Sequence, residues 1–181
     1  TLRLAALFHD IAKPLCQSFD ETGTAHYYGH AQKSAEIAEA VLRRLKADSE
    51  TIKTVSELVR RHEDRFEPSK KAVKRLLGKT SPEFFEKLLS LMEADEMGKR
   101  AEFRLSKDVF EEFRRLAAEI AENEECFSLK NLAVSGADLI SAGFEPGPGM
   151  GKILETLLEK VIEGEIPNEK SELLFLAKNV F

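Results

Sequence analysis

Apolar residues recur at spacings of three and four along most of the chain, which is the period of amphipathic helices. Pro14 is expected to end the first helix, because proline removes a backbone donor and clashes with the preceding turn. Alternating apolar residues nowhere persist long enough to predict a strand, so residues 17–29 are expected to form a loop. The predicted fold class is therefore all-α, with helices over residues 2–12, 30–46, 48–62, 69–78, 82–95, 106–122, 135–143, 148–163 and from 168 onward.

Most of these helices begin at a residue whose side chain can accept a bond from an unpaired backbone amide, or with proline at the first helical position. The predicted starts are Asp48 or Ser49, Ser69, Ser81-Pro82, Ser106, a capping box from Ser135 to Asp138, and Asn168. The character of the sequence changes near residues 123–134. We therefore predict a helical bundle over residues 1–125 and a helical extension over residues 126–181.

Composition is that of a globular chain: 43% of its 181 residues are hydrophobic, which suits one domain with or without a small extension. No apolar run approaches the ~20 residues of a membrane helix, so no membrane partner is expected. Cys16 and Cys126 lie far apart and are expected to be reduced thiols in a cytoplasmic protein. The chain begins inside an amphipathic pattern without a start methionine, so we expect a segment to precede it.

Charge is unevenly distributed, although the net charge is only −5. Residues 60–79 contain eight basic and three acidic residues, whereas acidic residues outnumber basic ones between Glu111 and Glu125. The basic run has two interpretations: a surface for a phosphate backbone, or a solvated helix face. The candidate RNA-binding residues are Arg60, Arg61, Arg65, Lys70, Lys71, Lys74 and Arg75.

The chemistry centres on the adjacent pair His9 and Asp10, at the end of the first predicted helix. A buried carboxylate is costly unless it is paired or bound to a cation. His30 opens the second helix, His62 closes the third, and Asp95 falls on the apolar face of the fifth. Imidazole and carboxylate together suit a divalent metal such as Mn, Fe, Ni or Zn. Spacing alone leaves open the alternative that these are unrelated polar residues of the core.

The order of several motifs resembles a known family. Residues 4–14 (LAALFHDIAKP) look like the signature of HD-superfamily metal-dependent phosphohydrolases. Residues 26–38 (HYYGHAQKSAEIA) are similar to the version found in bacterial tRNA nucleotidyltransferases, the family of CCA-adding enzymes and poly(A) polymerases. Residues 69–77, 91–95 and 132–151 follow in the same order. The resemblance implies an all-α HD domain from the region that follows the nucleotide-adding head.

The resemblance also implies roles for individual residues. His9, Asp10 and Asp95 would be metal ligands, for a divalent ion such as Mn, Ni, Fe or Mg. His30 and His62 would be further ligands or phosphate contacts, and Lys13 would contact a phosphate. His26, in the predicted loop, has no assigned role. The implied partners are tRNA or nucleotide phosphoesters and an N-terminal nucleotidyltransferase head.

Two features depart from what these motifs require. HD sites usually take a further histidine from a helix upstream of the His-Asp pair, and this chain begins after that point. The glycine-rich segment from Gly147 to Lys152 has three residues between Gly147 and Gly151 and Ile153 after the lysine, so it is not a phosphate-binding P-loop. A helix start in this segment still offers free amides to an RNA phosphate, or is a plain structural turn.

Two classes of function follow. The first is a metal-dependent phosphohydrolase acting on nucleotide or RNA phosphoesters, with His9, Asp10 and Asp95 holding the metal. The second is a catalytically silent scaffold that binds tRNA and supports the nucleotidyltransferase head. The sequence has no Gly-Ser motif with paired carboxylates on a sheet, so the chain by itself is not expected to add nucleotides. Its residues also do not indicate whether the parent protein adds CCA or poly(A).

Overall fold

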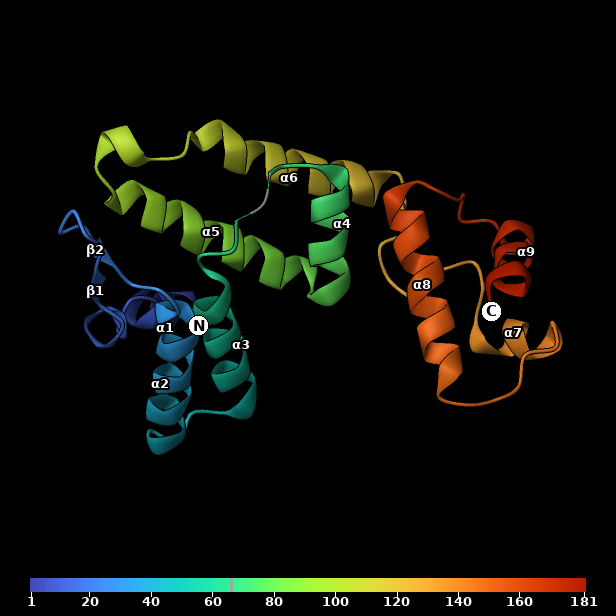
Figure 1. Ribbon diagram of the computed structural model, residues 1–181, viewed down its shortest axis with the longest axis horizontal. Coiled ribbons are helices and arrows are strands. Elements are labelled where there is room, and N and C mark those ends of the chain that lie inside the picture. The colour runs from blue at the N-terminus through green and yellow to red at the C-terminus, as the bar shows by residue number, and fades with distance from the viewer. Residues whose placement is uncertain (66) are drawn as a thin grey trace. The chain divides into compact units, whose positions relative to one another are not determined.

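The structure is a computed structural model that describes residues 1–65 and 67–181, and it is all-α as predicted (Figure 1). The helices are α1 (Leu2–Phe8), α2 (His30–Arg44), α3 (Ser49–Arg61), α4 (Lys70–Lys79), α5 (Pro82–Gly98), α6 (Lys107–Glu122), α7 (Gly136–Ser141), α8 (Gly149–Glu163) and α9 (Lys170–Val180). Single 3-10 turns follow α1 and α5, at Lys13–Leu15 and Ala101–Phe103. Within the described part of the chain, no helix is long and apolar enough to cross a membrane.

The chain divides into two compact units that alternate along the sequence. The first unit contains Thr1–Phe66 and Pro82–Phe110, and the second contains Glu67–Ser81 and Glu111–Phe181. Helix α4 therefore packs with the C-terminal helices, although the chain returns to the first unit for α5. The predicted domain boundary at residue 125 stays a prediction.

The core of the first unit lies between α1, α2, α3 and α5, with α2 and α3 packed side by side (Figure 1). Its fully buried side chains include Ala5, Ala35, Val55, Leu58 and Leu88. Helix α3 starts as the sequence predicts, because the side chain of Asp48 accepts a hydrogen bond from the backbone N–H of Thr51 at 2.8 Å. The packing of these four helices brings the end of α1, the start of α2 and the end of α3 together.

The predicted loop between α1 and α2 contains a small hairpin that the sequence analysis missed. Strands β1 (Ser18–Phe19) and β2 (Ala25–His26) pair antiparallel. The turn is held by Asp20, whose Oδ1 accepts bonds from the backbone N–H groups of Thr22 and Thr24, and by Gly23, which adopts a φ of +80°. A pairing of two residues per strand is too short to leave an alternating pattern in the sequence.

The core of the second unit gathers α7, α8 and α9 around fully buried Leu139, Leu157 and Leu173. The predicted capping box of Ser135 and Asp138 is present at the start of α7. The prediction that Asn168 opens the last helix is wrong, because the N-cap of α9 is Glu169 and no side-chain bond caps it. The side chain of Asn168 bonds elsewhere instead. Its Oδ1 accepts a hydrogen bond from the N–H of Ala133, and its Nδ2 donates one to the carbonyl of Asn131.

Candidate metal centre

Three imidazole rings are fixed in the same way in the first unit. His9 follows the last residue of α1, His30 is the first residue of α2, and His62 follows the last residue of α3. In each ring Nδ1 lies within hydrogen-bond distance of the carbonyl oxygen three residues earlier. The accepting carbonyls are those of Ala6, Tyr27 and Val59, at 2.8, 2.9 and 2.7 Å. Because Nδ1–H donates to a carbonyl, Nε2 is the atom left to bind a ligand.

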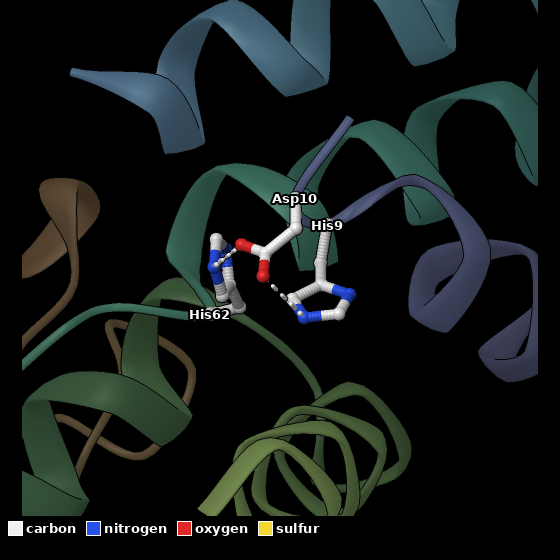
Figure 2. A group of neighbouring side chains, drawn as sticks. All are labelled: His9, Asp10 and His62. Carbon is white, nitrogen blue, oxygen red and sulfur yellow. Dashed lines mark ion pairs between the residues drawn. The ribbon is translucent and has the colours of Figure 1, made fainter. Parts of the chain in front are cut away.

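All three Nε2 atoms face one carboxylate, that of Asp10 (Figure 2 shows His9, Asp10 and His62). His9 Nε2 lies 3.3 Å from Oδ2, while His30 Nε2 and His62 Nε2 lie 3.1 and 3.7 Å from Oδ1. Helix α5 contributes Asp95, whose Oδ1 lies 3.4 Å from His9 Nε2. The structure therefore brings together the residues that the sequence predicts as metal ligands, with His30 and His62 beside them.

The two carboxylates and the imidazole of His9 shift one another's protonation. Hydrogen bonds to Asp10 and Asp95 raise the pKa of His9 to about 10. Burial alone would raise the pKa of Asp10, but the neighbouring imidazoles of His62 and His9 and the ammonium group of Lys13 outweigh it and hold that pKa well below its usual range. The pKa of Asp95 is also lowered, chiefly by His9. The cluster therefore favours ionised carboxylates beside a positive charge.

The donor set fits a divalent cation. Asp10 Oδ1 is buried and has no hydrogen bond, although two imidazole nitrogens point at it. His30 Nε2 and His62 Nε2 lie only 3.4 Å apart. With each Nδ1–H donated to a carbonyl, unprotonated Nε2 lone pairs would face a carboxylate lone pair, and a proton or a cation removes that repulsion. Two overlapping groups have all their ligand atoms within 4.8 Å of one another: His9, Asp10 and His62, and His30, His62 and Glu63.

Two lysines lie at the carboxylates of the centre. Lys13 Nζ is 2.6 Å from Asp10 Oδ2, and its predicted contact with a phosphate stays a prediction. Lys99 Nζ is 3.4 Å from Asp95 Oδ2 and also contacts the buried carboxylate of Glu96. The sequence analysis missed Lys99, although a lysine four residues after an aspartate was a usable signal. Glu63, next to His62 in the chain, was also missed.

The predicted RNA-binding residues fall in both units and take part in ion pairs. In the first unit, Arg60, Arg61 and Arg65 lie near Glu57, Asp64 and Glu96. In the second unit, Lys70 and Lys74 contact Glu125, while Lys71 and Arg75 contact Glu163. An acidic residue just after α6 and one at the end of α8 thus neutralise much of the basic face of α4. Binding of RNA by these seven residues stays a prediction.

These features define an all-α protein with a His/Asp cluster built from the ends of three helices and one residue of a fourth. The model of the family described as tRNA nucleotidyltransferase domain 2 (putative) matches residues 25–177, which is most of the chain. The chain belongs to this family. The predicted recognition as a tRNA nucleotidyltransferase region is thereby confirmed, and the HD-type assignment stays a prediction.

Individual relatives agree with the family. The chain is 34% identical to a CC-adding tRNA nucleotidyltransferase of Thermus thermophilus over 96% of this chain and 39% of the relative. It is 29% identical to an A-adding tRNA nucleotidyltransferase of Deinococcus radiodurans over 98% of this chain and 41% of the relative. A CCA-adding enzyme of Lacticaseibacillus paracasei is 52% identical over 28% of the chain and 13% of that enzyme. The chain thus spans about two fifths of the length of the first two relatives, and no solved structure matches it significantly.

Proposed function

We propose that the first unit is a metal-dependent phosphohydrolase of the HD type that acts on phosphoesters of nucleotides or RNA ends. The observation that carries the proposal is the common orientation of His9, His30 and His62, each anchored through Nδ1 and each presenting Nε2 to the Asp10 carboxylate. Outer hydrogen bonds of this kind are what fix metal-binding imidazoles in proteins.

The residues have distinct roles in this proposal. His9, Asp10 and Asp95 would hold the divalent ion, for which Mn, Ni, Fe and Mg are the candidates. A bound divalent cation supplies Lewis acidity, which polarises a phosphoryl oxygen and lowers the pKa of water. Lys13 and Lys99 place positive charge beside the carboxylates and would attract the phosphoryl group. His30 and His62 would position it or carry a proton.

We also infer that the whole protein is a tRNA nucleotidyltransferase that processes tRNA 3′ ends, with its nucleotide-adding head outside this chain. Family membership supports this inference, as do relatives whose names describe CC-, A- and CCA-adding enzymes. On that basis a second function for the chain is a scaffold that holds tRNA for the head. The four basic residues of α4 form ion pairs with acidic residues of the second unit, which fits a role for α4 in supporting the fold of such a scaffold.

Metal content distinguishes the two functions. We expect the purified chain to carry a divalent metal in about stoichiometric amount and to hydrolyse a nucleotide phosphoester with added Mn or Ni. Asp10→Ala should lose both, because it removes the carboxylate that all three imidazoles face. Asp108→Ala is the matched control, since Asp108 is an exposed aspartate in the first turn of α6 whose carboxylate accepts a hydrogen bond from Ser106. Elemental analysis and phosphate release provide the measurements.

The opposite result is equally informative. A folded wild-type chain without metal or turnover would leave the scaffold as the function of this chain. Loss of metal in Asp108→Ala as well as in Asp10→Ala would show that the loss does not depend on the Asp10 carboxylate, and retention of metal in Asp10→Ala would place the binding site elsewhere. Far-UV circular dichroism should confirm that each variant is folded.

A further inference from the structure

The hairpin between α1 and α2 displays aromatic side chains in solvent. Tyr28 is 78% exposed and Phe19 is 65% exposed, although both rings carry large apolar surfaces. Exposed aromatic surface is costly to leave in water, and contiguous patches of it commonly mark binding sites. The hairpin leads directly into His30, the first residue of α2.

The ring of Tyr28 is held in place in spite of its exposure. Its O–H donates to Nδ1 of His26 at 3.3 Å, and the two rings stack with centroids 5.2 Å apart and planes at 6°. His26 Nε2 in turn donates to Asp20 Oδ2 at 2.8 Å. Asp20 also ties down the hairpin turn through the N–H groups of Thr22 and Thr24. A ring that is fixed before binding loses little conformational entropy when a ligand covers it.

The hairpin is connected to the Asp10 centre by its own residues. Tyr27 precedes Tyr28, and its carbonyl oxygen accepts the bond from Nδ1 of His30 at 2.9 Å. Lys13 Nζ lies 2.6 Å from Asp10 Oδ2 and 5.9 Å from the centroid of the Tyr27 ring. A phosphate beside Lys13 would therefore have the ring of Tyr27 as its neighbour, and Tyr28 is the next residue along the chain.

We propose that Tyr28, supported by His26, is the platform on which the base of a nucleotide substrate stacks while its phosphate lies at the Asp10 centre. Every nucleobase offers an aromatic face, and proteins that bind unpaired bases commonly stack them on Tyr, Phe or His. This inference rests on the proposed function and assigns specificity for nucleotides over base-free phosphoesters to one exposed residue. His26 and Asp20 act as positioning residues.

The chain offers a direct readout, because it contains two tyrosines, Tyr27 and Tyr28, and no tryptophan. Binding of adenosine 5′-monophosphate should quench tyrosine fluorescence, and ribose 5-phosphate is the probe without a base. We expect adenosine 5′-monophosphate to bind at least about tenfold more tightly than ribose 5-phosphate, within the range for base–aromatic stacking. Tyr28→Ala should remove this preference, and Tyr28→Phe should retain most of it when binding is followed by calorimetry.

Phe175→Ala is the matched control, because Phe175 is 69% exposed on α9 and should leave the preference unchanged. Equal or undetectable binding of both probes by the wild type, or an unchanged preference in Tyr28→Ala, would overturn the platform. Failure of the proposed hydrolase activity would look different. If no phosphate is released from any nucleotide but the Tyr28-dependent preference for adenosine 5′-monophosphate is present, the hydrolase activity is overturned and the platform is supported.

Discussion

At the scale of single residues, helix ends determine how the three imidazoles are oriented. The last carbonyls of a helix have no partner within the helix, so an imidazole placed just after the helix can take one of them. His9 and His62 do this at the ends of α1 and α3, with Ala6 and Val59. His30 obtains the same anchor from the Tyr27 carbonyl in the turn before α2.

The sequence predicted which residues cluster but not how they are oriented. Helical spacing placed Asp95 on an apolar face, and the family resemblance joined it with His9 and Asp10 into one candidate site. The Nδ1 bonds depend on side-chain torsions that spacing does not encode. Lys99 was missed for a different reason: its approach to Asp95 is local, but a lysine at the end of an amphipathic helix is ordinarily solvated.

Asp138 provides a prediction about pH. Lys170, then the hydroxyl and N–H of Ser135, hold the pKa of the Asp138 carboxyl well below its usual range. A lowered pKa stabilises the fold above the unfolded value of about 3.9, and this stabilisation is lost as the pH falls through the folded value. We therefore expect Asp138→Asn to lower the free energy of unfolding at pH 7 and to have a smaller effect near pH 2.

Urea denaturation of wild type and Asp138→Asn over pH 2–7 measures this difference. The difference in unfolding free energy between the two proteins should shrink steadily below pH 4. A difference that stays constant with pH would mean that shape, and not the charge of Asp138, matters at the start of α7.

At the scale of elements, the sequence predicted best what is decided locally. Asp48, Ser69 and Ser135 cap their helices as expected, because a capping bond reaches only three residues along the chain. Asn168 failed because its side chain bonds the backbone at residues 131 and 133, more than 30 residues away. Helix α5 also runs on to Gly98, one turn beyond the predicted end at Asp95.

Two helical glycines allow a paired test of packing. A Cβ at Gly78 in α4 would lie 2.2 Å from the carbonyl oxygen of Phe127, whereas a Cβ at Gly98 in α5 would meet nothing within 4 Å. We expect Gly78→Ala to destabilise the protein by about 1–3 kcal/mol, since backbone must move. Gly98→Ala should be neutral or stabilise it by up to about 1 kcal/mol, because alanine favours the helix.

Equilibrium urea denaturation of both variants measures this difference in stability. The midpoint should fall for Gly78→Ala and should rise or stay the same for Gly98→Ala. Equal stability of Gly78→Ala and wild type would show that the segment around Phe127 yields to α4 without cost.

At the scale of the whole molecule, the sequence could not show that the two units alternate along the chain. Helix α4 joins the second unit through Lys70, Lys71 and Lys74, which pair with acidic residues 49 to 92 positions later. Such long-range pairing leaves no periodic signal, so only the change of composition near residues 123–134 was visible. The reversal of charge between α4 and α6 is the sequence trace of this pairing.

The predicted RNA-binding residues differ in how exposed they are and how closely they are paired with a carboxylate. The side chain of Arg65 is 66% exposed, and its ion pair with Glu96 is long, at 3.6 Å. The side chain of Lys74 is only 12% exposed and lies 2.7 Å from Glu125. If tRNA binds through this set, Arg65 is available to a phosphate, whereas Lys74 would have to leave a carboxylate that itself repels RNA.

We therefore expect Arg65→Ala to reduce the slope of log affinity for tRNA against log salt concentration by about 1, because each phosphate contact releases about one counterion. Lys74→Ala should leave that slope unchanged and lower the free energy of unfolding by up to about 1 kcal/mol. Filter binding at several salt concentrations and urea denaturation test both variants. An unchanged slope in Arg65→Ala would mean that Arg65 does not contact tRNA. A reduced slope in Lys74→Ala would show that RNA displaces Glu125, because only the release of that ion pair exposes Lys74 to a phosphate.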